Sequence, residues 1–167
     1  MNSRRAGFTL IELMVVVLIM GLMASVAVLS VRGHIDRARW TRSFEQIEQL
    51  DRIGRIAARR DASRYQLRFN RAKRSVELYA VESNVFKKKL REVKLPTSLE
   101  FASFQKAGNV GRGNDFEVEI ASNGQSPSYA LSIQTSSSQP QWLVVLGFSG
   151  QQIRMENARD VAAILPR

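Results

Sequence analysis

Glu12 is the residue whose chemistry most constrains this chain, because it lies at the edge of a long apolar segment. It is the only charged residue between Arg5 and Arg32. A carboxylate carried to the centre of a bilayer costs roughly 2.5–3.5 kcal/mol, so an acid inside a membrane needs a partner. We therefore expect a cationic partner for Glu12.

Cysteine and histidine, two common residues of catalytic and metal sites, are nearly absent from the 167 residues. There is no cysteine, which excludes disulfides, thiolate metal ligands and cysteine nucleophiles. The single histidine, His34, lies in a basic helical stretch without partners for a metal site or a serine-histidine-acid triad. We interpret His34 as a surface residue near a membrane boundary, and we expect neither enzymatic activity nor a cofactor.

The spacing of the acidic residues in the second half of the chain does not indicate a catalytic or metal site. Asp115, Glu117 and Glu119 alternate strictly, which places all three on one face of a strand, and the solvent face explains them. Glu156 and Asp160 are not clustered with other oxygen ligands, so no calcium loop is expected near the end of the chain. We assign no metal.

A basic run is the best candidate for binding an anion. It consists of Lys87, Lys88, Lys89, Arg91 and Lys94, in a chain of net charge +10. Phosphate-binding surfaces are built from such clusters, and a solvated loop has the same composition. Charge alone does not choose between nucleic acid, lipid headgroups and acidic proteins.

The elements that position these residues begin with an apolar helix. Residues 13–31 form a run of nineteen without a charge, and at about 1.5 Å per residue this run spans a hydrocarbon core of ~30 Å. A secretory signal has a shorter apolar core followed by its cleavage site. Here the only similar site, at 24–27, lies within the run, so we predict a membrane helix.

A second, amphipathic stretch follows without a proline. Its apolar residues recur every three or four positions, as on one face of a helix: Trp40, Phe44, Ile47, Leu50, Gly54 and Ala57. The opposite face is charged, and Glu48 and Arg52 are spaced for an i,i+4 ion pair. We expect the helix to continue out of the membrane and to cover a domain with its apolar face.

From Tyr65 onward, short runs of alternating apolar residues predict about six strands, separated by turn residues. They centre on 65–69, 76–80, 116–120, 129–133, 142–146 and 153–155. A helix followed by strands, without βαβ alternation, indicates an α+β fold in which a long N-terminal helix packs on an antiparallel sheet.

The segment Gly7-Phe8-Thr9-Leu10-Ile11-Glu12-Leu13, preceded by Arg4 and Arg5, resembles the class III signal of type IV prepilins and pseudopilins. The resemblance implies the pilin fold, and cleavage between Gly7 and Phe8 by a prepilin peptidase that then methylates Phe8. The domains expected are a leader at 1–7, a transmembrane helix at 8–31, an amphipathic helix at 32–62 and an antiparallel β domain at 63–167.

The same resemblance gives Glu12 a role in assembly, because the family pairs this glutamate with the amino terminus of a neighbouring subunit. It also implies an inner-membrane protein that crosses once and places its C-terminal domain in the periplasm. The arginines after the apolar run outnumber Arg4 and Arg5 before it, which by the positive-inside rule favours the opposite orientation. We give the processing motif more weight than the arginine count, and we therefore expect the C-terminal domain in the periplasm.

A further resemblance, to the H-type minor pseudopilins of type II secretion and to related minor pilins, rests on three segments. They are 42–60 of the helix, Ile120-Ala121-Ser122-Asn123-Gly124-Gln125-Ser126, and Val144-Val145 followed by Ser149-Gly150. It implies a minor pseudopilin that joins other pseudopilin subunits near the tip of a periplasmic fibre driving protein export. The alternatives are a minor pilin of a type IV pilus that binds DNA through its basic surface, and a membrane-tethered domain that is never processed.

Overall fold

The computed structural model describes residues 9–82, 87–107, 109–111, 115–135 and 139–165. The side chains of these residues are described as well, except those at 26–36 and 109–111. The chain divides into two compact units, Met1–Arg39 and Trp40–Arg167, which we treat separately. Helix α1 extends from Leu10 to Asp61 and contributes to both.

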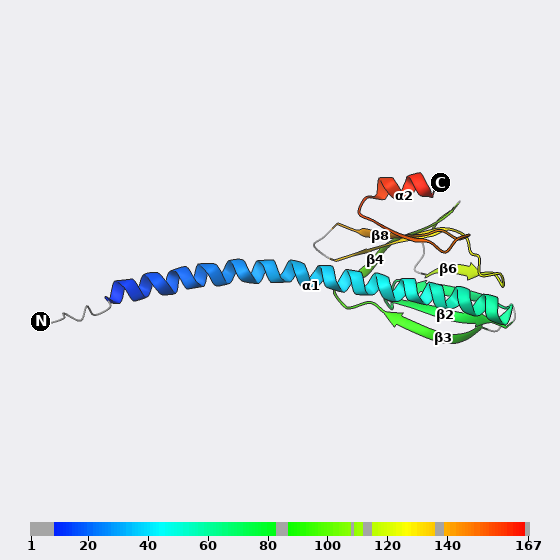
Figure 1. Ribbon diagram of the computed structural model, residues 1–167, viewed down its shortest axis with the longest axis horizontal. Helices are drawn as coiled ribbons and strands as arrows, with labels where there is room; N and C mark the ends of the chain where they lie inside the picture. Colours follow the sequence, from blue (N-terminus) through cyan, green and yellow to red (C-terminus); the bar gives the residue numbers. More distant parts are fainter. Residues whose placement is uncertain (1–8, 83–86, 108, 112–114, 136–138, 166–167) are drawn as a thin grey trace, which may run out of the picture. The chain divides into compact units, whose positions relative to one another are not determined.

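The remaining elements all belong to the second unit (Figure 1). They are β1 (Arg64–Asn70), β2 (Ser75–Val81), β3 (Lys87–Lys94), β4 (Glu100–Lys106), β5 (Asn109–Gly111), β6 (Asp115–Ile120), β7 (Tyr129–Gln134), β8 (Gln141–Val145), β9 (Gln152–Met155) and α2 (Ala158–Ile164).

Helix α1 ends through a backbone reversal. Ala62 adopts a left-handed conformation with φ of 48°, and the Ser63 N–H donates to the carbonyl of Ala58 at 3.2 Å. This bond satisfies one of the carbonyls that a helix leaves unpaired in its last turn. The reversal turns the chain directly into β1.

The strands of the described residues form two antiparallel sheets. The first has the order β3-β2-β1-β6 and the second the order β5-β4-β7-β8-β9. The α+β class with antiparallel sheets, predicted from the sequence, is confirmed. The six predicted strands correspond to β1, β2, β6, β7, β8 and β9.

The sequence pattern does not predict β3, β4 and β5, and it predicts one sheet where the described residues form two. The basic run is strand β3 rather than a loop, and it was overlooked because an edge strand rich in lysine lacks an apolar alternation. In β4 the register shifts between Phe101 and Ser103, so Phe101 and Phe104 are both buried although they are three residues apart. That bulge breaks the period of two on which strand prediction depends.

The main core joins α1 to both sheets. From α1, the side chains of Phe44, Ile47 and Leu50 are each 1% exposed, which confirms the predicted apolar stripe. At Gly54 the helix comes so close to the first sheet that a Cβ atom would lie 2.8 Å from Ile120 Cδ1. Across the core, the ring of Phe69 contacts four other aromatic rings: Phe101, Phe104, Phe116 and Tyr129.

Helix α2, which the sequence pattern also does not predict, covers the other face of the second sheet (Figure 1). Val161 of α2 and the following Leu165 pack with Trp142 and Val144 of β8 and with Ala130 of β7. Strands β7 and β8 are consequently buried on both faces.

This arrangement predicts that the stripe of α1 cannot be removed without loss of solubility. A chain truncated to begin at Gly33 should be soluble with mixed helix and strand content, because it keeps the whole stripe. A chain beginning at Tyr65 should aggregate, because it exposes an apolar face worth roughly 25 cal/mol per Å². Circular dichroism and size-exclusion chromatography measure both, and a folded monomer beginning at Tyr65 would contradict the packing described here.

Candidate functional site

Glu12 lies in the first turn of α1, where Thr9 caps the helix. The Glu12 N–H donates to Thr9 Oγ1 at 3.3 Å and to the Thr9 carbonyl at 3.1 Å. A helix N-terminus favours a negative charge, so this position suits a carboxylate. Glu12 is exposed and has no ion pair among the described residues. Gly7 and Phe8, the predicted cleavage junction, lie outside the described residues.

The helix beyond Glu12 is apolar on every side. Its large apolar side chains between Leu10 and Met23 are 44–77% exposed. They therefore contribute to no core within the described part of the chain. Among the described residues, no helical stretch has the length and apolar character required to cross a membrane. The membrane helix expected at 8–31 stays a prediction.

The basic run does not form one continuous patch, because its side chains lie on two faces of β3. Lys87, Lys89 and Lys94 lie on the outer face of the first sheet, while Lys88 and Arg91 are opposite Ala80 and Leu78. Since Leu78 is a core residue, Lys88 and Arg91 belong to the face that packs on α1. The register shift between Leu78 and Tyr79 accommodates the extra residue, Leu90.

The three lysines on the outer face lie close to carboxylates. Lys89 Nζ is 3.1 Å from Glu92 Oε2 and 3.4 Å from Glu77 Oε1, and these two acids raise the pKa of Lys89. Lys94 is 3.8 Å from Glu92, and Lys87 is 3.8 Å from Glu117. Their charge is locally balanced, which weakens this face as a site for anions.

The alternating acids of β6 lie on the same outer face, as predicted. Glu119 pairs with Arg64 at 3.1 Å and Glu117 with Arg68 at 2.9 Å, while Asp115 accepts a hydrogen bond from the Asn70 amide at 2.7 Å. Among the described residues there is no cluster of acids, histidines and cysteines that could hold a metal ion. The outer face of the first sheet therefore carries a series of surface ion pairs.

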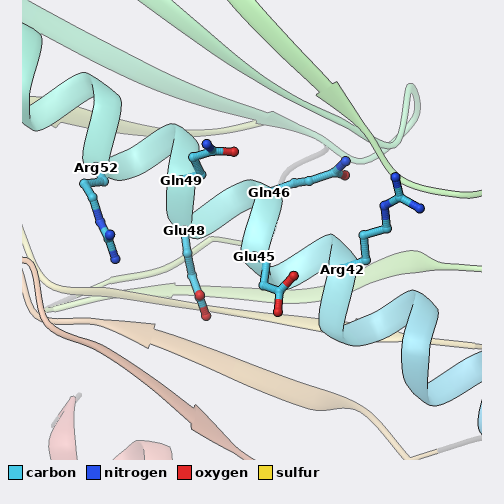
Figure 2. A pocket seen from close by; sticks show the side chains of 6 residues that line it. All are labelled: Arg42, Glu45, Gln46, Glu48, Gln49 and Arg52. Carbon is cyan, nitrogen blue, oxygen red and sulfur yellow. The ribbon is translucent and has the colours of Figure 1, made fainter.

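The polar side of α1 carries charged residues, as predicted. Arg42, Gln46 and Gln49 point to one side of the helix, and Glu45, Glu48 and Arg52 point to the other (Figure 2). The expected i,i+4 pair of Glu48 with Arg52 is not the contact that Glu48 makes. Both its oxygens instead accept from Arg154 of β9, at 2.8 and 2.9 Å. Two parallel hydrogen bonds between a guanidinium and a carboxylate are stronger than the ion pair expected between exposed side chains of one helix.

The most constrained polar cluster is centred on Arg55, which is 5% exposed. Its Nε–H donates to Asp51 Oδ2 at 2.7 Å, one turn earlier on α1. Asp51 is completely buried, and its other oxygen accepts a hydrogen bond from the hydroxyl of Tyr129 at 3.1 Å. Burial raises the pKa of Tyr129 well above its usual value of 10, and Asp51 raises it further, so the hydroxyl stays protonated and donates.

The other donors of Arg55 bind two loops. Nη1 donates to the carbonyls of Gly124 at 3.1 Å and Gly147 at 2.7 Å, and Nη2 donates to Ser126 Oγ at 2.8 Å. The two loops also contact each other, because the Ser126 N–H donates to the Gly147 carbonyl at 3.1 Å. Arg55 therefore fixes the turn before β7 and the turn after β8 to α1.

Glycines permit this close approach. A Cβ atom at Gly147 would lie 1.8 Å from the Ser126 carbonyl oxygen, so only glycine fits there. Gly124 and Gly150 adopt φ of +79° and +71°, and both pack against the arginines of α1. The three segments that carry the H-type resemblance thus meet at one place, around Arg55.

The sequence pattern alone does not distinguish Asp51, Arg55 or Tyr129 from other polar residues. Asp51 and Arg55 are an acid and an arginine spaced i,i+4 beside the apolar stripe, which is the only local pattern that could have marked them. Glu48 and Arg52 have the same spacing on the polar side of the helix. Spacing alone could not distinguish the buried pair from the surface pair. All the polar groups of the cluster have partners, which suits a structural role rather than catalysis.

Comparisons with known proteins found one matching family model and similar solved structures. The family model of the prokaryotic N-terminal methylation motif matches residues 2–28. A structure of the minor pseudopilin EpsH from the type 2 secretion system of Vibrio cholerae aligns with a TM-score of 0.59 and 13% identity, over 72% of this chain and 97% of that one. A second EpsH structure gives a TM-score of 0.54 and 12% identity, over 66% and 91%.

The chain carries a prepilin-type N-terminal motif. It combines the N-terminal methylation motif with the fold of an H-type minor pseudopilin, as the sequence analysis predicted. No curated protein matches the chain. At 12–13% identity the EpsH structures establish the fold.

The contacts of Arg55 predict that this residue contributes strongly to the stability of the second unit. Arg55→Ala should lower the free energy of unfolding by about 3–5 kcal/mol, because it leaves Asp51 buried without its cation and removes one hydrogen-bond donor from each of two loop carbonyls. Arg52→Ala, one turn earlier and exposed, is the control and should change stability by less than about 0.5 kcal/mol. Urea denaturation of the chain beginning at Gly33 gives both values, and equal stability of the two variants would refute the role assigned to Arg55.

Proposed function

We propose that this protein is a minor pseudopilin subunit of a type II secretion-like pseudopilus, which assembles into or near the tip of a periplasmic fibre that drives protein export. The observation that carries the proposal is the N-terminal methylation motif at residues 2–28 in the same chain as the fold of a minor pseudopilin. In this role the protein is a structural component and catalyses no reaction.

The proposal places the chain in the inner membrane with a single crossing and its C-terminal domain in the periplasm. The uncharged run at 13–31 and the exposure of the apolar side chains from Leu10 to Met23 support it. A helix that is apolar all round is stable in lipid or among other apolar helices, but not in water. The same segment would pack with the helices of other subunits once the fibre forms.

Glu12 has the central role in assembly under this proposal. A prepilin peptidase cleaves between Gly7 and Phe8 and methylates Phe8, and the new amine of a neighbouring subunit pairs with Glu12. The capped first turn orients Glu12 at the N-terminal end of the helix, where such an amine would arrive. Pairing would remove the cost of an isolated carboxylate in an apolar environment.

A type IV pilus subunit that binds DNA is the weaker alternative. Lys87, Lys89 and Lys94 lie within 4 Å of carboxylates, and Lys88 and Arg91 lie on the other face of β3. DNA binding depends on neutralising phosphates with unpaired cations on one surface. We therefore favour secretion over DNA capture.

Processing is tested by the intact mass of the protein from cells with and without the peptidase. We expect a form that begins at Phe8 and carries one added methyl group when the peptidase is present, and the full-length form when it is absent. A chain that still begins at Met1 or Asn2 in the presence of the peptidase would exclude processing and would favour a simple membrane-tethered domain.

Assembly is tested by Glu12→Ala. This variant should insert, fold and be cleaved, yet it should fail to co-purify with the other fibre subunits and should abolish secretion. Simple anchoring predicts the reverse, because losing the charge lowers the cost of lying in lipid. Normal incorporation and secretion of Glu12→Ala would exclude the pairing role.

Two further substitutions at Glu12 and one elsewhere separate charge from other effects. Glu12→Gln keeps the shape and the capping-box position but removes the charge, so it should behave like Glu12→Ala. Glu12→Asp keeps the charge but withdraws the carboxylate by one methylene, and we expect partial incorporation. Glu45→Ala removes an exposed acid from the later part of α1 and should assemble normally.

A further inference from the structure

Asn123 and Gly124 form the one asparagine–glycine pair of this sequence, and they lie in the turn between β6 and β7. In such a pair the backbone nitrogen of the glycine can attack the side-chain amide of the asparagine, because the glycine has no side chain to hinder the approach. Asparagine is one of the chemically labile residues that proteins from hot environments contain less often. The turn therefore contains a reactive pair of residues.

The fold requires the glycine of this pair. Gly124 adopts a φ of +79°, a conformation that other residues rarely accept. A Cβ atom there would lie 2.9 Å from Arg59 Cγ and 3.1 Å from the Arg55 carbonyl oxygen, so the turn packs directly on α1. Asparagine suits the preceding position, because its side chain bonds to the backbone of a turn. The reactive pair thus follows from the way in which this turn is built.

In the folded chain the attacking atom and its target are both held by hydrogen bonds. The Gly124 N–H donates to the Ala121 carbonyl at 2.8 Å, and the Ala121 N–H donates to the Gln125 carbonyl at 2.7 Å. Asn123 Oδ1 accepts from the Gln125 N–H at 3.0 Å, and Asn123 Nδ2 donates to Gln125 Oε1 at 3.0 Å. The Gly124 nitrogen becomes available for attack only when its bond to Ala121 breaks.

Arg55 holds the same turn from its buried side. Its Nη1 donates to the Gly124 carbonyl at 3.1 Å, and its Nη2 donates to Ser126 Oγ at 2.8 Å. Gly124 is buried, whereas Asn123 is exposed. The asparagine is therefore accessible to water in the folded chain, while access of a base to the Gly124 nitrogen requires the turn to leave α1.

We propose that Asn123 is a site of spontaneous deamidation, and that the turn held by Arg55 limits the rate. When the turn opens, a base removes the proton of the Gly124 nitrogen, and this nitrogen bonds to Asn123 Cγ. The Cγ–Nδ2 bond breaks, and Nδ2 leaves as ammonia after taking a proton back from the protonated base, so that a cyclic imide remains. Water then opens the ring at one of its two carbonyl carbons and leaves aspartate or isoaspartate at position 123.

The isoaspartate product changes the backbone of the turn. It inserts one additional carbon atom into the main chain before Gly124, between two backbone hydrogen bonds that close the turn. The Gly124 carbonyl then no longer fits the position in which it accepts from Arg55. Modification therefore prevents the turn from closing again on α1.

The site is tested by mapping isoaspartate in peptides from the full-length chain, purified in detergent and incubated at mildly alkaline pH with or without enough urea to unfold it. We expect isoaspartate at Asn123 in urea, and formation slower by about tenfold or more in the folded chain, because the reaction then depends on local opening. Asn70, which precedes Arg71, is the internal control and should stay unmodified over the same period.

The role of Arg55 is tested by Arg55→Lys, which keeps a cation beside Asp51 but lacks the guanidinium fork that binds the turn. This variant should modify about threefold or more faster than the wild type while folded, and Arg52→Lys should modify at the wild-type rate. Circular dichroism at the incubation temperature establishes that each variant is folded. If Arg55→Lys does not fold, Arg59→Ala replaces it, because it removes the side chain packed against Gly124 and should also accelerate the reaction.

Three results would overturn the inference. The absence of isoaspartate at Asn123 in urea, or equal formation at Asn70, would exclude the site. Equal rates for the folded and the unfolded wild type would exclude protection by the turn. A folded Arg55→Lys variant that modifies at the wild-type rate, or Arg59→Ala doing so in its place, would exclude control of the reaction by the packing of the turn on α1.

Discussion

Arg55 brings a full positive charge into a largely apolar core, and the geometry of the globular unit depends on how that charge is satisfied. Asp51 neutralises it within one turn of α1, and the remaining donors bind the carbonyls of Gly124 and Gly147. A buried guanidinium without these partners would be costly, so the two loops have one favourable position each. The cluster specifies where strands β7 and β8 begin and end relative to the helix.

The two parts of the chain place different physical demands on one helix. From Leu10 to Met23, α1 is apolar on all sides and makes no contribution to the core, whereas from Trp40 onward it buries a single stripe between two sheets. The first pattern suits lipid or neighbouring helices, and the second suits a water-soluble domain.

Charge in this protein is informative only where its local partners are known. The net charge of +10 and the lysine run suggest an anionic ligand, but the fold distributes the run over two faces of β3 and brings carboxylates to three of its members. The run also occupies the edge of a sheet, where lysines and a bulge discourage pairing with another chain. A solvated, self-paired edge explains these residues without a ligand.

The sequence by itself determined the prepilin-type motif, the apolar stripe of α1 and the antiparallel α+β class, because each depends on local spacing along the chain. It could not give β4, where a bulge breaks the alternation, or β3, whose charged edge has no apolar pattern. The sequence could not predict the Arg55 cluster either, since Asp51–Arg55 and Glu48–Arg52 have identical spacing. Only the tertiary structure decides which of the two pairs is buried, because burial depends on loops that are about 70 to 90 residues away in the sequence.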